Sequence, residues 1–185
     1  KLASGLGANV YILDISHDNL RYLDDVMPSN VHTIYSNRYT LTNLLPKIDL
    51  LIGAVLVVGA KAPKLVDRKL LSLMQSGSVL VDVSVDQGGC IETTKPTTHE
   101  NPTFVEENVT HYCVANMPGA VPYTSTVALC NATFKYIKEL TNYGLEAFKN
   151  NESLLKGLNV YKNKVTHPAV AKSFNLNYTD PLKLL

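Results

Sequence analysis

Asp86 is the residue whose surroundings most directly suggest chemistry. It follows an apolar run at residues 79–85 and precedes Gly88 and Gly89. A carboxylate placed where an apolar run stops meets a cleft rather than bulk water and can carry a proton, and glycines let the backbone approach a ligand. The alternative is a turn or capping residue whose oxygens accept backbone N–H groups.

A second stretch, at residues 110–119, repeats this pattern. Its apolar run ends in Asn116, Met117, Pro118 and Gly119. The Asn116 amide suits ligand binding, although asparagine is also common in turns. Both runs are rich in β-branched residues, which is typical of buried parallel strands, and ligands bind at the carboxyl ends of such strands. We therefore expect a ligand-binding loop after each strand.

Asp14 ends another apolar run, at residues 8–14. Dinucleotide-binding folds place an acid at the tip of their second strand, where it hydrogen-bonds the adenosine ribose hydroxyls and disfavours a 2′-phosphate. A charged hydrogen bond of this kind is worth roughly 1.5–3 kcal/mol. The alternative is that Asp14 caps the helix expected to start near His17.

The elements that would position these residues alternate along the chain. The expected strands are at residues 8–14, 31–35, 48–56, 79–85 and 110–115. The expected helices are at residues 17–27, 40–45 and 67–75. Such alternation predicts an α/β fold, a doubly wound (Rossmann-like) parallel sheet with helices on both faces.

Three further residues have two interpretations each. Gly53 fits close approach of the backbone to a ligand, or close packing inside the protein. Lys95 and His99 lie in a polar loop at residues 93–102, which suits a functional role or plain solvent exposure.

A long helix is expected at residues 122–142. Its apolar residues recur at three- and four-residue spacing, a stripe that we interpret as core: Val127, Cys130, Phe134, Ile137 and Leu140. Residues 143–185 show short helical segments and no strand–loop–strand alternation, so we expect them to pack against something outside this fold unit. The predicted division is a nucleotide-binding domain at 1–120, a connecting helix at 121–142 and a further segment at 143–185.

Composition and charge indicate a small-molecule partner. The 185 residues contain 17 Lys and Arg against 16 Asp and Glu and no basic run, so neither nucleic acid nor a membrane surface is expected as a partner. The 45% apolar content can build a real core. Three cysteines without metal-ligand spacing predict no metal site and the reduced thiols of an intracellular, cytoplasmic protein.

Several motifs, in order and over essentially the whole chain, resemble the carboxyl-terminal half of bacterial alanine dehydrogenases. They are Ile12-Leu13-Asp14, Tyr35-Ser36-Asn37, Ile52-Gly53-Ala54-Val55-Leu56, Gly59-Ala60-Lys61-Ala62-Pro63, residues 83–90, Lys95-Pro96-Thr97-Thr98 and residues 111–119. The resemblance implies reversible deamination of L-alanine to pyruvate and ammonia with NAD, by hydride transfer from the substrate Cα to the nicotinamide.

The resemblance also implies roles for individual residues. Asp86 corresponds to the family's catalytic aspartate, which acts with a histidine and a lysine of the amino-terminal domain. Asp14 corresponds to the ribose-binding acid and Ser36 to a cofactor-contacting serine. The implied backbone contacts to the cofactor come from Val55 and Leu56. The two loops implied to wrap the nicotinamide are Val83, Ser84, Val85 and Asp86, and Val114, Ala115, Asn116 and Met117.

Two positions depart from the family pattern. Asn19 stands where many members have a basic residue, and Lys95 stands where an arginine is usual. Lysine lacks the bidentate geometry of arginine. Both departures therefore weaken particular cofactor contacts.

The resemblance further implies that a first strand, a phosphate-binding glycine loop and an amino-terminal domain precede Lys1. Gly5 and Gly7 do not supply that loop, because they stand before a strand rather than after one. In the strand order 3-2-1-4-5-6 the first strand is central, so we expect a gap with unpaired backbone groups on both sides. We expect the isolated chain neither to fold as a stable monomer nor to catalyse alone.

Two alternatives keep the fold and change the function. One is the NAD-binding part of a proton-translocating transhydrogenase, whose soluble domain resembles this family. The run from Asp86 to Gly89 argues against it, since hydride exchange between nucleotides does not require the acid. The other is a truncated, non-catalytic module for cofactor binding or oligomerisation. The family also implies a homo-oligomer, a hexamer.

Overall fold

The computed structural model describes residues 1–57 and 60–185. It begins with a short helix, α1 (Leu2–Gly5), and Gly7 then adopts a positive φ of 91°, as a turn after a helix requires. Two parallel strands follow, β1 (Val10–Asp14) and β2 (Val31–Tyr35), joined by helix α2 (His17–Val26). Gly59 of the loop motif at residues 59–63 lies outside the described residues.

A second sheet has the strand order β3-β4-β6-β5. Strands β3 (Leu50–Gly53), β4 (Val79–Asp82) and β6 (Val109–Tyr112) are parallel, whereas β5 (Thr103–Glu106) pairs with β6 in the antiparallel sense. The parallel strands and intervening helices confirm the predicted α/β fold. The strands end earlier than expected, since residues 83–85 have already left β4.

Strand β5 is missing from the sequence-based prediction. It forms a hairpin with β6 through Glu107 and Asn108, which have φ values of 53° and 59°. Two consecutive left-handed residues are the signature of a two-residue hairpin turn, which usually carries glycine. The pair Glu107-Asn108 lacks that glycine, so the sequence does not mark the turn.

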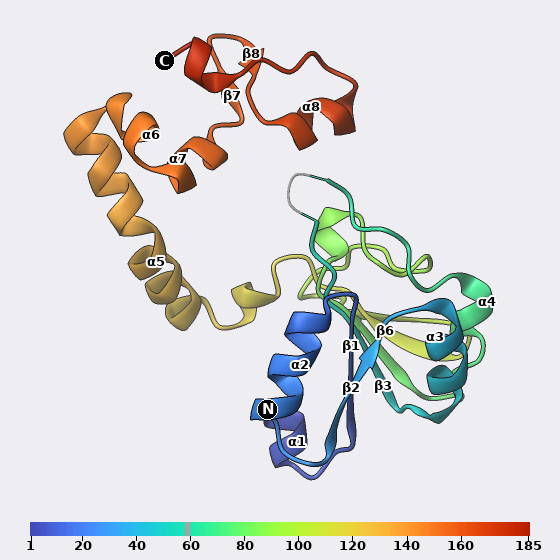
Figure 1. Cartoon of the computed structure of the whole chain (residues 1–185). Coiled ribbons are helices and arrows are strands. Elements are labelled where there is room, and N and C mark those ends of the chain that lie inside the picture. Colours follow the sequence, from blue (N-terminus) through green and yellow to red (C-terminus); the bar gives the residue numbers. More distant parts are fainter. Residues whose placement is uncertain (58–59) are drawn as a thin grey trace.

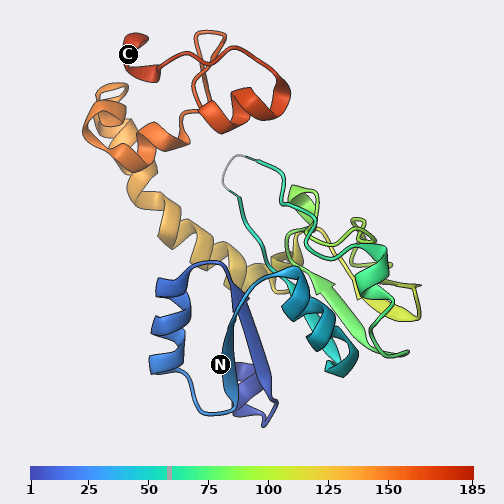
Figure 2. The same cartoon turned by 45° about the vertical axis from the view of Figure 1, so that its right-hand side comes forward.

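The sheet of β1 and β2 is separate from the second sheet (Figure 1), and in the turned view β1 is the strand nearer to β3 (Figure 2). A cavity of about 720 Å³ between them is lined by residues of both strands, among them Tyr11, Ile12, Leu50 and Ile52. Tyr11, Leu50 and Ile52 are 42%, 48% and 58% exposed, although they are large and apolar. The gap lies where the strand order places the first strand, as expected.

The hydrophobic core belongs to the second sheet. Leu80 on β4, Val109 on β6 and Leu71 are fully buried in it. Helix α3 (Arg38–Leu44) leads into η1 (Leu45–Lys47), which buries Leu45 in the same core. This core holds β3, β4 and β6 together and thereby fixes the carboxyl ends of these strands.

Helix α4 is shorter than the predicted helix at residues 67–75 and spans Arg68–Leu71. The Asp67 carboxylate caps it by accepting the Leu70 N–H at 2.8 Å. The helix ends early because Leu73 and Met74 donate their N–H groups three residues back, to Leu70 and Leu71, in a tighter turn.

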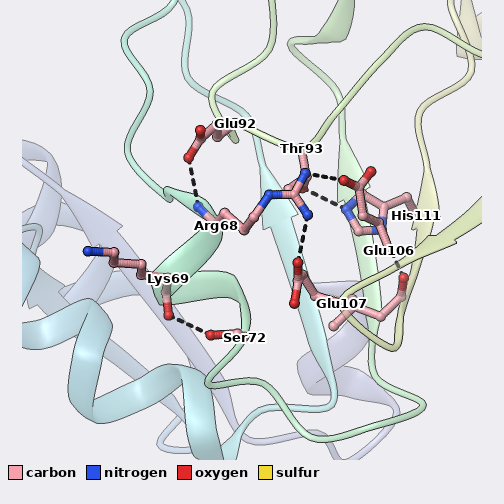
Figure 3. Close-up of polar contacts among 9 residues, drawn as sticks. Arg68, Lys69, Ser72, Glu92, Thr93, Glu106, Glu107 and His111 are labelled. Carbon is pink, nitrogen blue, oxygen red and sulfur yellow. Dashed lines mark hydrogen bonds and ion pairs between the residues drawn. The ribbon is translucent and has the colours of Figure 1, made fainter.

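Arg68 ties α4 to the β5–β6 hairpin (Figure 3). Its guanidinium pairs with Glu106 and with Glu107, the latter at 2.6 Å, and its backbone N–H donates to Glu92 at 2.8 Å. Glu107 and then Glu106 raise the pKa of Arg68, and Arg68 lowers the pKa of Glu106. Since these groups are solvent-accessible, the pairs orient the hairpin more than they stabilise it.

Helix α5 (Pro122–Tyr143) corrects the prediction that its apolar stripe is core. None of its residues is buried among the described parts of the chain, and Phe134 and Ile137 are 64% and 56% exposed. Figure 1 shows the reason, because α5 runs away from the sheets to a small C-terminal unit. The apolar spacing identified the helix correctly but not what covers it.

The C-terminal unit consists of short elements. They are α6 (Glu146–Asn150), α7 (Glu152–Gly157), β7 (Val160–Tyr161), β8 (Lys164–Val165), α8 (Pro168–Phe174) and η4 (Pro181–Lys183). The hairpin β7–β8 lies in residues 143–185, where the sequence shows no strand–loop–strand alternation. Each strand has only two residues, too few to show a period of two, and the turn uses Lys162 and Asn163 at positive φ. None of the described helices is long and apolar enough to cross a membrane.

Candidate active site

Asp14, Asn19 and Ser36 lie together at the carboxyl ends of β1 and β2. The Asp14 carboxylate accepts the Ser16 N–H at 2.9 Å and the Asn19 side-chain amide at 3.2 Å. The Ser36 N–H donates to the Asp14 carbonyl oxygen at 2.9 Å, which fixes the start of its loop beside the acid.

The cap of α2 is Ser16, whose hydroxyl accepts the Asn19 N–H at 3.3 Å. Asp14 is therefore not needed as the N-cap. The Ser16 N–H, followed by the Asn19 amide, lowers the pKa of Asp14, so this carboxylate is ionised near neutral pH. The Ser16, Asn19 and Ile15 donors fill at most three of the four lone pairs of the two oxygens, which leaves room for a further donor such as a ribose hydroxyl.

An aromatic pair stands at the same end of this sheet, and the sequence analysis missed it. The rings of His17 and Tyr35 stack with centroids 5.0 Å apart and an interplanar angle of 18°. Tyr35 is directly opposite Asp14 in the register of β1 and β2. A ligand bound by Asp14 would therefore lie next to an aromatic surface.

Gly53, at the end of β3, is a packing glycine. A methyl group added to it would lie 2.5 Å from the Cys90 sulfur and 3.2 Å from Ile91. Beyond it, Val55 packs partly buried against the core, while Leu56 is 64% exposed. These two residues follow β3 at the same edge of the second sheet as the loop that follows β4.

The loop after β4 carries Val83, Ser84, Val85 and Asp86. The Val83 N–H donates to the Gly53 carbonyl at 2.8 Å, and the side chains of Ser84 and Val85 are buried. Asp86 lies in the short helix η2 (Val85–Gln87) with its carboxylate exposed. The loop thus anchors its inner residues and presents the acid outward.

The loop after β6 meets Asp86 at Asn116. Val114 is buried, and Asn116 adopts a left-handed conformation with φ 57° and ψ 53° before η3 (Met117–Ala120). The Asn116 N–H points to the Asp86 Oδ2 at 3.5 Å, a long hydrogen bond. The structure therefore brings together the two loops that follow β4 and β6, with Ala115 and Met117 beside their meeting point.

His99, whose role the sequence leaves open, lies beside Asn116 as well. Its Nε2 lies 3.0 Å from the Asn116 carbonyl oxygen. A methyl group on Gly119 would lie 3.1 Å from the Asn116 amide nitrogen and 3.2 Å from the His99 Nε2. Both side chains thus occupy the space that the missing Gly119 side chain leaves.

The Lys95 ammonium lies 4.5 Å from the centroid of the Phe104 ring, which stacks on the buried His111. A cofactor contact by Lys95 would require its side chain to leave this ring. No group of three or more metal-ligating side chains occurs among the residues that the structure describes.

Comparisons with known proteins place this arrangement in a family. Residues 1–168 match the family model described as alanine dehydrogenase/PNT, C-terminal domain. An alanine dehydrogenase of Staphylococcus haemolyticus (strain JCSC1435) is 54% identical over 181 residues, which are 97% of this chain and 48% of that protein. Alanine dehydrogenase 2 of Staphylococcus aureus (strain USA300) is 52% identical over 180 residues, 96% of this chain and 48% of that protein.

Two solved structures have the same fold. An L-alanine dehydrogenase has a TM-score of 0.81 at 49% identity, covering 94% of this chain and 48% of its own. A transhydrogenase from Sinorhizobium meliloti has a TM-score of 0.66 at 22% identity, covering 90% and 45%, which shows the fold alone. The chain spans about half the length of the curated relatives that it matches. The protein belongs to the alanine dehydrogenase/PNT family and corresponds to the C-terminal domain of that family.

Proposed function

We propose that this chain is the NAD-binding half of an enzyme that reversibly deaminates L-alanine to pyruvate and ammonia. The observation that carries the proposal is the meeting of Asp86 and Asn116, delivered by two parallel strands at their carboxyl ends. This is the edge at which open α/β sheets bind ligands. The relatives at 54% and 52% identity, named alanine dehydrogenases, support the choice of reaction.

The described residues fit a dinucleotide with an unmodified ribose. Asp14 is ionised and has room for a further donor, and Asn19 and Ser36 are held beside it. We assign these three residues to the adenosine ribose, and Val55 and Leu56 to backbone contacts further along the cofactor. NAD, when bound, supplies the hydride acceptor.

The loops 83–86 and 114–117 are assigned to the nicotinamide end. Val83 and Met117 offer apolar surface there, which would exclude water from the reacting carbon, while the buried Val114 supports its loop from beneath. Ser84, Val85 and Ala115 hold these loops in place. Lys95 is assigned a weaker contact to the cofactor, for which it would leave the Phe104 ring.

Asp86 handles protons in this proposal. Oxidation of the Cα–N bond and addition of water both displace protons from the substrate, and a positioned carboxylate can accept and return them. The neighbouring Asn116 N–H orients the Asp86 carboxylate. General acid–base catalysis of this kind contributes about 10²–10⁴-fold to a rate.

A transhydrogenase function has weaker support. The transhydrogenase neighbour is 22% identical, against 49% for the L-alanine dehydrogenase structure. We further propose that the rest of the enzyme covers the exposed face of α5, that residues 143–185 return to the substrate domain, and that the enzyme assembles as a hexamer in the cytoplasm. A truncated, non-catalytic module would instead leave α5 exposed.

The test is NADH formation from L-alanine and NAD by the protein as isolated, with its intact mass taken from the same sample. We expect activity together with a mass well above 20.3 kDa. Asp86→Asn should lower kcat by about a hundredfold with little change in the Kd for NAD. Asp25→Asn, on an exposed position of α2, is the matched control and should keep full activity. Unchanged turnover of Asp86→Asn would reject the role of Asp86.

A further inference from the structure

We infer that Asp82 is a positioning residue: its buried carboxylate closes the loop that carries Asp86 by binding both ends of that loop at once. The inference rests on the proposed function of Asp86. Asp82 is the last residue of β4, and the sequence presents it as an ordinary strand residue. Its role comes from contacts that span twelve positions of the chain, from Asp82 to Thr94.

The Asp82 side chain is 0% exposed. Its Oδ1 accepts the Ser84 N–H at 2.9 Å, at the start of the loop. Its Oδ2 accepts the Cys90 N–H at 3.1 Å, at the end of the loop. One carboxylate therefore holds together the two residues between which Val85, Asp86 and Gln87 form η2.

Thr94 supplies a third donor. Its Oγ1 lies 2.7 Å from the Asp82 Oδ2 and 2.9 Å from the Ile91 carbonyl oxygen. A hydroxyl has one proton to donate, and the shorter contact to a charged acceptor is the stronger one. We therefore assign the Thr94 proton to Asp82.

These hydrogen bonds offset the cost of removing the Asp82 carboxylate from water. Asp82 forms no ion pair with any residue that the structure describes. A buried carboxylate without a cation depends on N–H and O–H donors, so each donor that is lost leaves charge uncompensated. The Cys90 thiol, 3.8 Å from the Asp82 Oδ1, is a fourth and weaker donor. The loop is consequently held in the one arrangement that supplies all of these donors.

Gly89 makes this arrangement possible. It has a φ of +69°, and a methyl group on it would lie 2.7 Å from the Asp82 Oδ2 and 2.5 Å from the Thr94 Oγ1. The Lys64 ammonium lies 3.5 Å from the same methyl position and donates to the Gly88 carbonyl at 2.6 Å and to the Ile91 carbonyl at 2.9 Å. Gly89 thus admits the carboxylate to the centre of the loop, in addition to any approach to a ligand.

Fixing both ends of the loop sets where Asp86 stands relative to Asn116. A catalytic group displaced by about 1 Å can cost about 10²-fold in rate, so the position of Asp86 depends on Asp82 without any contact between Asp82 and substrate. The adenosine end of the cofactor is assigned to the other sheet, around Asp14. Loss of the Asp82 contacts should therefore affect turnover and leave NAD binding nearly unchanged.

Thr94 allows a test that spares the buried charge. In the enzyme that contains this chain, Thr94→Val removes the hydroxyl donor and keeps the shape of the side chain. Thr94→Ser keeps the hydroxyl donor and loses only the methyl group. We expect Thr94→Val to lower kcat about tenfold with the KM for NAD within about twofold, and Thr94→Ser to keep at least about half of the activity. Asp82→Asn, which loses acceptors toward Cys90 and Thr94, should lower kcat about a hundredfold.

Amide hydrogen exchange supplies a readout that needs no turnover. Thr94→Val should speed the exchange of the Ser84 and Cys90 amides about tenfold relative to Thr94→Ser, while the amides of β6 keep their rates. Faster exchange in an enzyme without alanine activity would support the Asp82 contacts and refute only the proposed reaction. The inference would be overturned by unchanged amide exchange in Thr94→Val, or by equal kcat values for Thr94→Val and Thr94→Ser. Both results can be obtained even if the Asp82→Asn variant fails to fold.

Discussion

The His99 Nε2 lies 3.0 Å from the carbonyl oxygen of Asn116, while the Asn116 N–H points to Asp86 at 3.5 Å. The side chains of His99 and Asp86 thus contact the carbonyl and the N–H group of Asn116, respectively. The residue itself is left-handed, a conformation that asparagine adopts more readily than most residues. Because a carbonyl oxygen only accepts, the Nε2 of His99 must carry a proton in this arrangement.

We predict that His99→Phe lowers kcat about threefold to tenfold, because Asn116 loses its carbonyl partner and Asp86 loses a fixed neighbour. His99→Gln should keep most of the activity, since its amide can donate to the same oxygen. Steady-state kinetics with L-alanine and NAD compare the two variants. Equal rates for Phe and Gln would show that the hydrogen bond does not matter.

Gly119→Ala should also lower kcat, in this case by crowding the side chains of Asn116 and His99. The added methyl group must displace Asn116 or His99, which lie 3.1 and 3.2 Å from its position. Gly157→Ala is the matched control, because no atom of the described residues lies within 4 Å of the corresponding position and its φ is not positive. The kcat of Gly119→Ala should fall several-fold below that of Gly157→Ala; identical values would contradict the tight packing.

We predict that NAD binding requires ionised Asp14 and is lost only in strong acid. The Ser16 N–H and then the Asn19 side-chain amide lower the pKa of Asp14, so its carboxylate stays charged to lower pH than that of an ordinary aspartate. The stability that these hydrogen bonds contribute is present above the unfolded pKa and is lost as the pH falls through the lower, folded pKa. Asn19→Leu should shift the acid limb of NAD binding, measured by calorimetry, to higher pH.

Asp14→Asn provides the complementary test at neutral pH. It should weaken NAD binding about tenfold, since one charged hydrogen bond becomes neutral, and should improve the relative affinity for NADP. An unchanged ratio of the two affinities would argue that Asp14 does not face the ribose.

The three thiols should differ sharply in reactivity. Burial raises the pKa of Cys113 to about 11 and also raises that of Cys90, where the Asp82 charge adds to the effect. Both are buried, whereas Cys130 on α5 is exposed. In the folded enzyme that contains this chain, a disulfide reagent at pH near 8 should leave Cys90 and Cys113 unmodified in peptide mass spectra, whereas Cys130 differs from them in being exposed on the chain itself. Both buried thiols should react once urea unfolds the enzyme, and fast labelling of either one in the folded enzyme would contradict their burial.

The gap between β1 and β3 predicts poor stability of the 185 residues produced alone. Backbone groups on the facing edges of β1 and β3 have no strand partner among residues 1–57 and 60–185, and Tyr11, Leu50 and Ile52 are left exposed beside them. Calorimetry of the isolated chain should show no cooperative melt, and no NADH should form from L-alanine. A sharp melting transition together with alanine-dependent activity would refute this prediction.

The sequence by itself determined the parallel strands β1, β2, β3, β4 and β6 and the polar residues that follow them. Asp14, Asp86 and Asn116 were singled out because each follows an apolar run, and the structure places each at or just beyond the carboxyl end of a strand. Such local signals are readable, because a buried parallel strand must be apolar and the loop after it must not be.

Tertiary structure alone decided which of these ends meet and what surrounds them. The hairpins β5–β6 and β7–β8 depend on left-handed residues without glycine, and the exposure of α5 depends on what packs against it. The role of Asp82 depends on residues 8 and 12 positions away that the fold brings to one carboxylate. Local propensity describes a residue and its neighbours, whereas burial and hydrogen bonding across a fold depend on the alignment of strands distant in the chain.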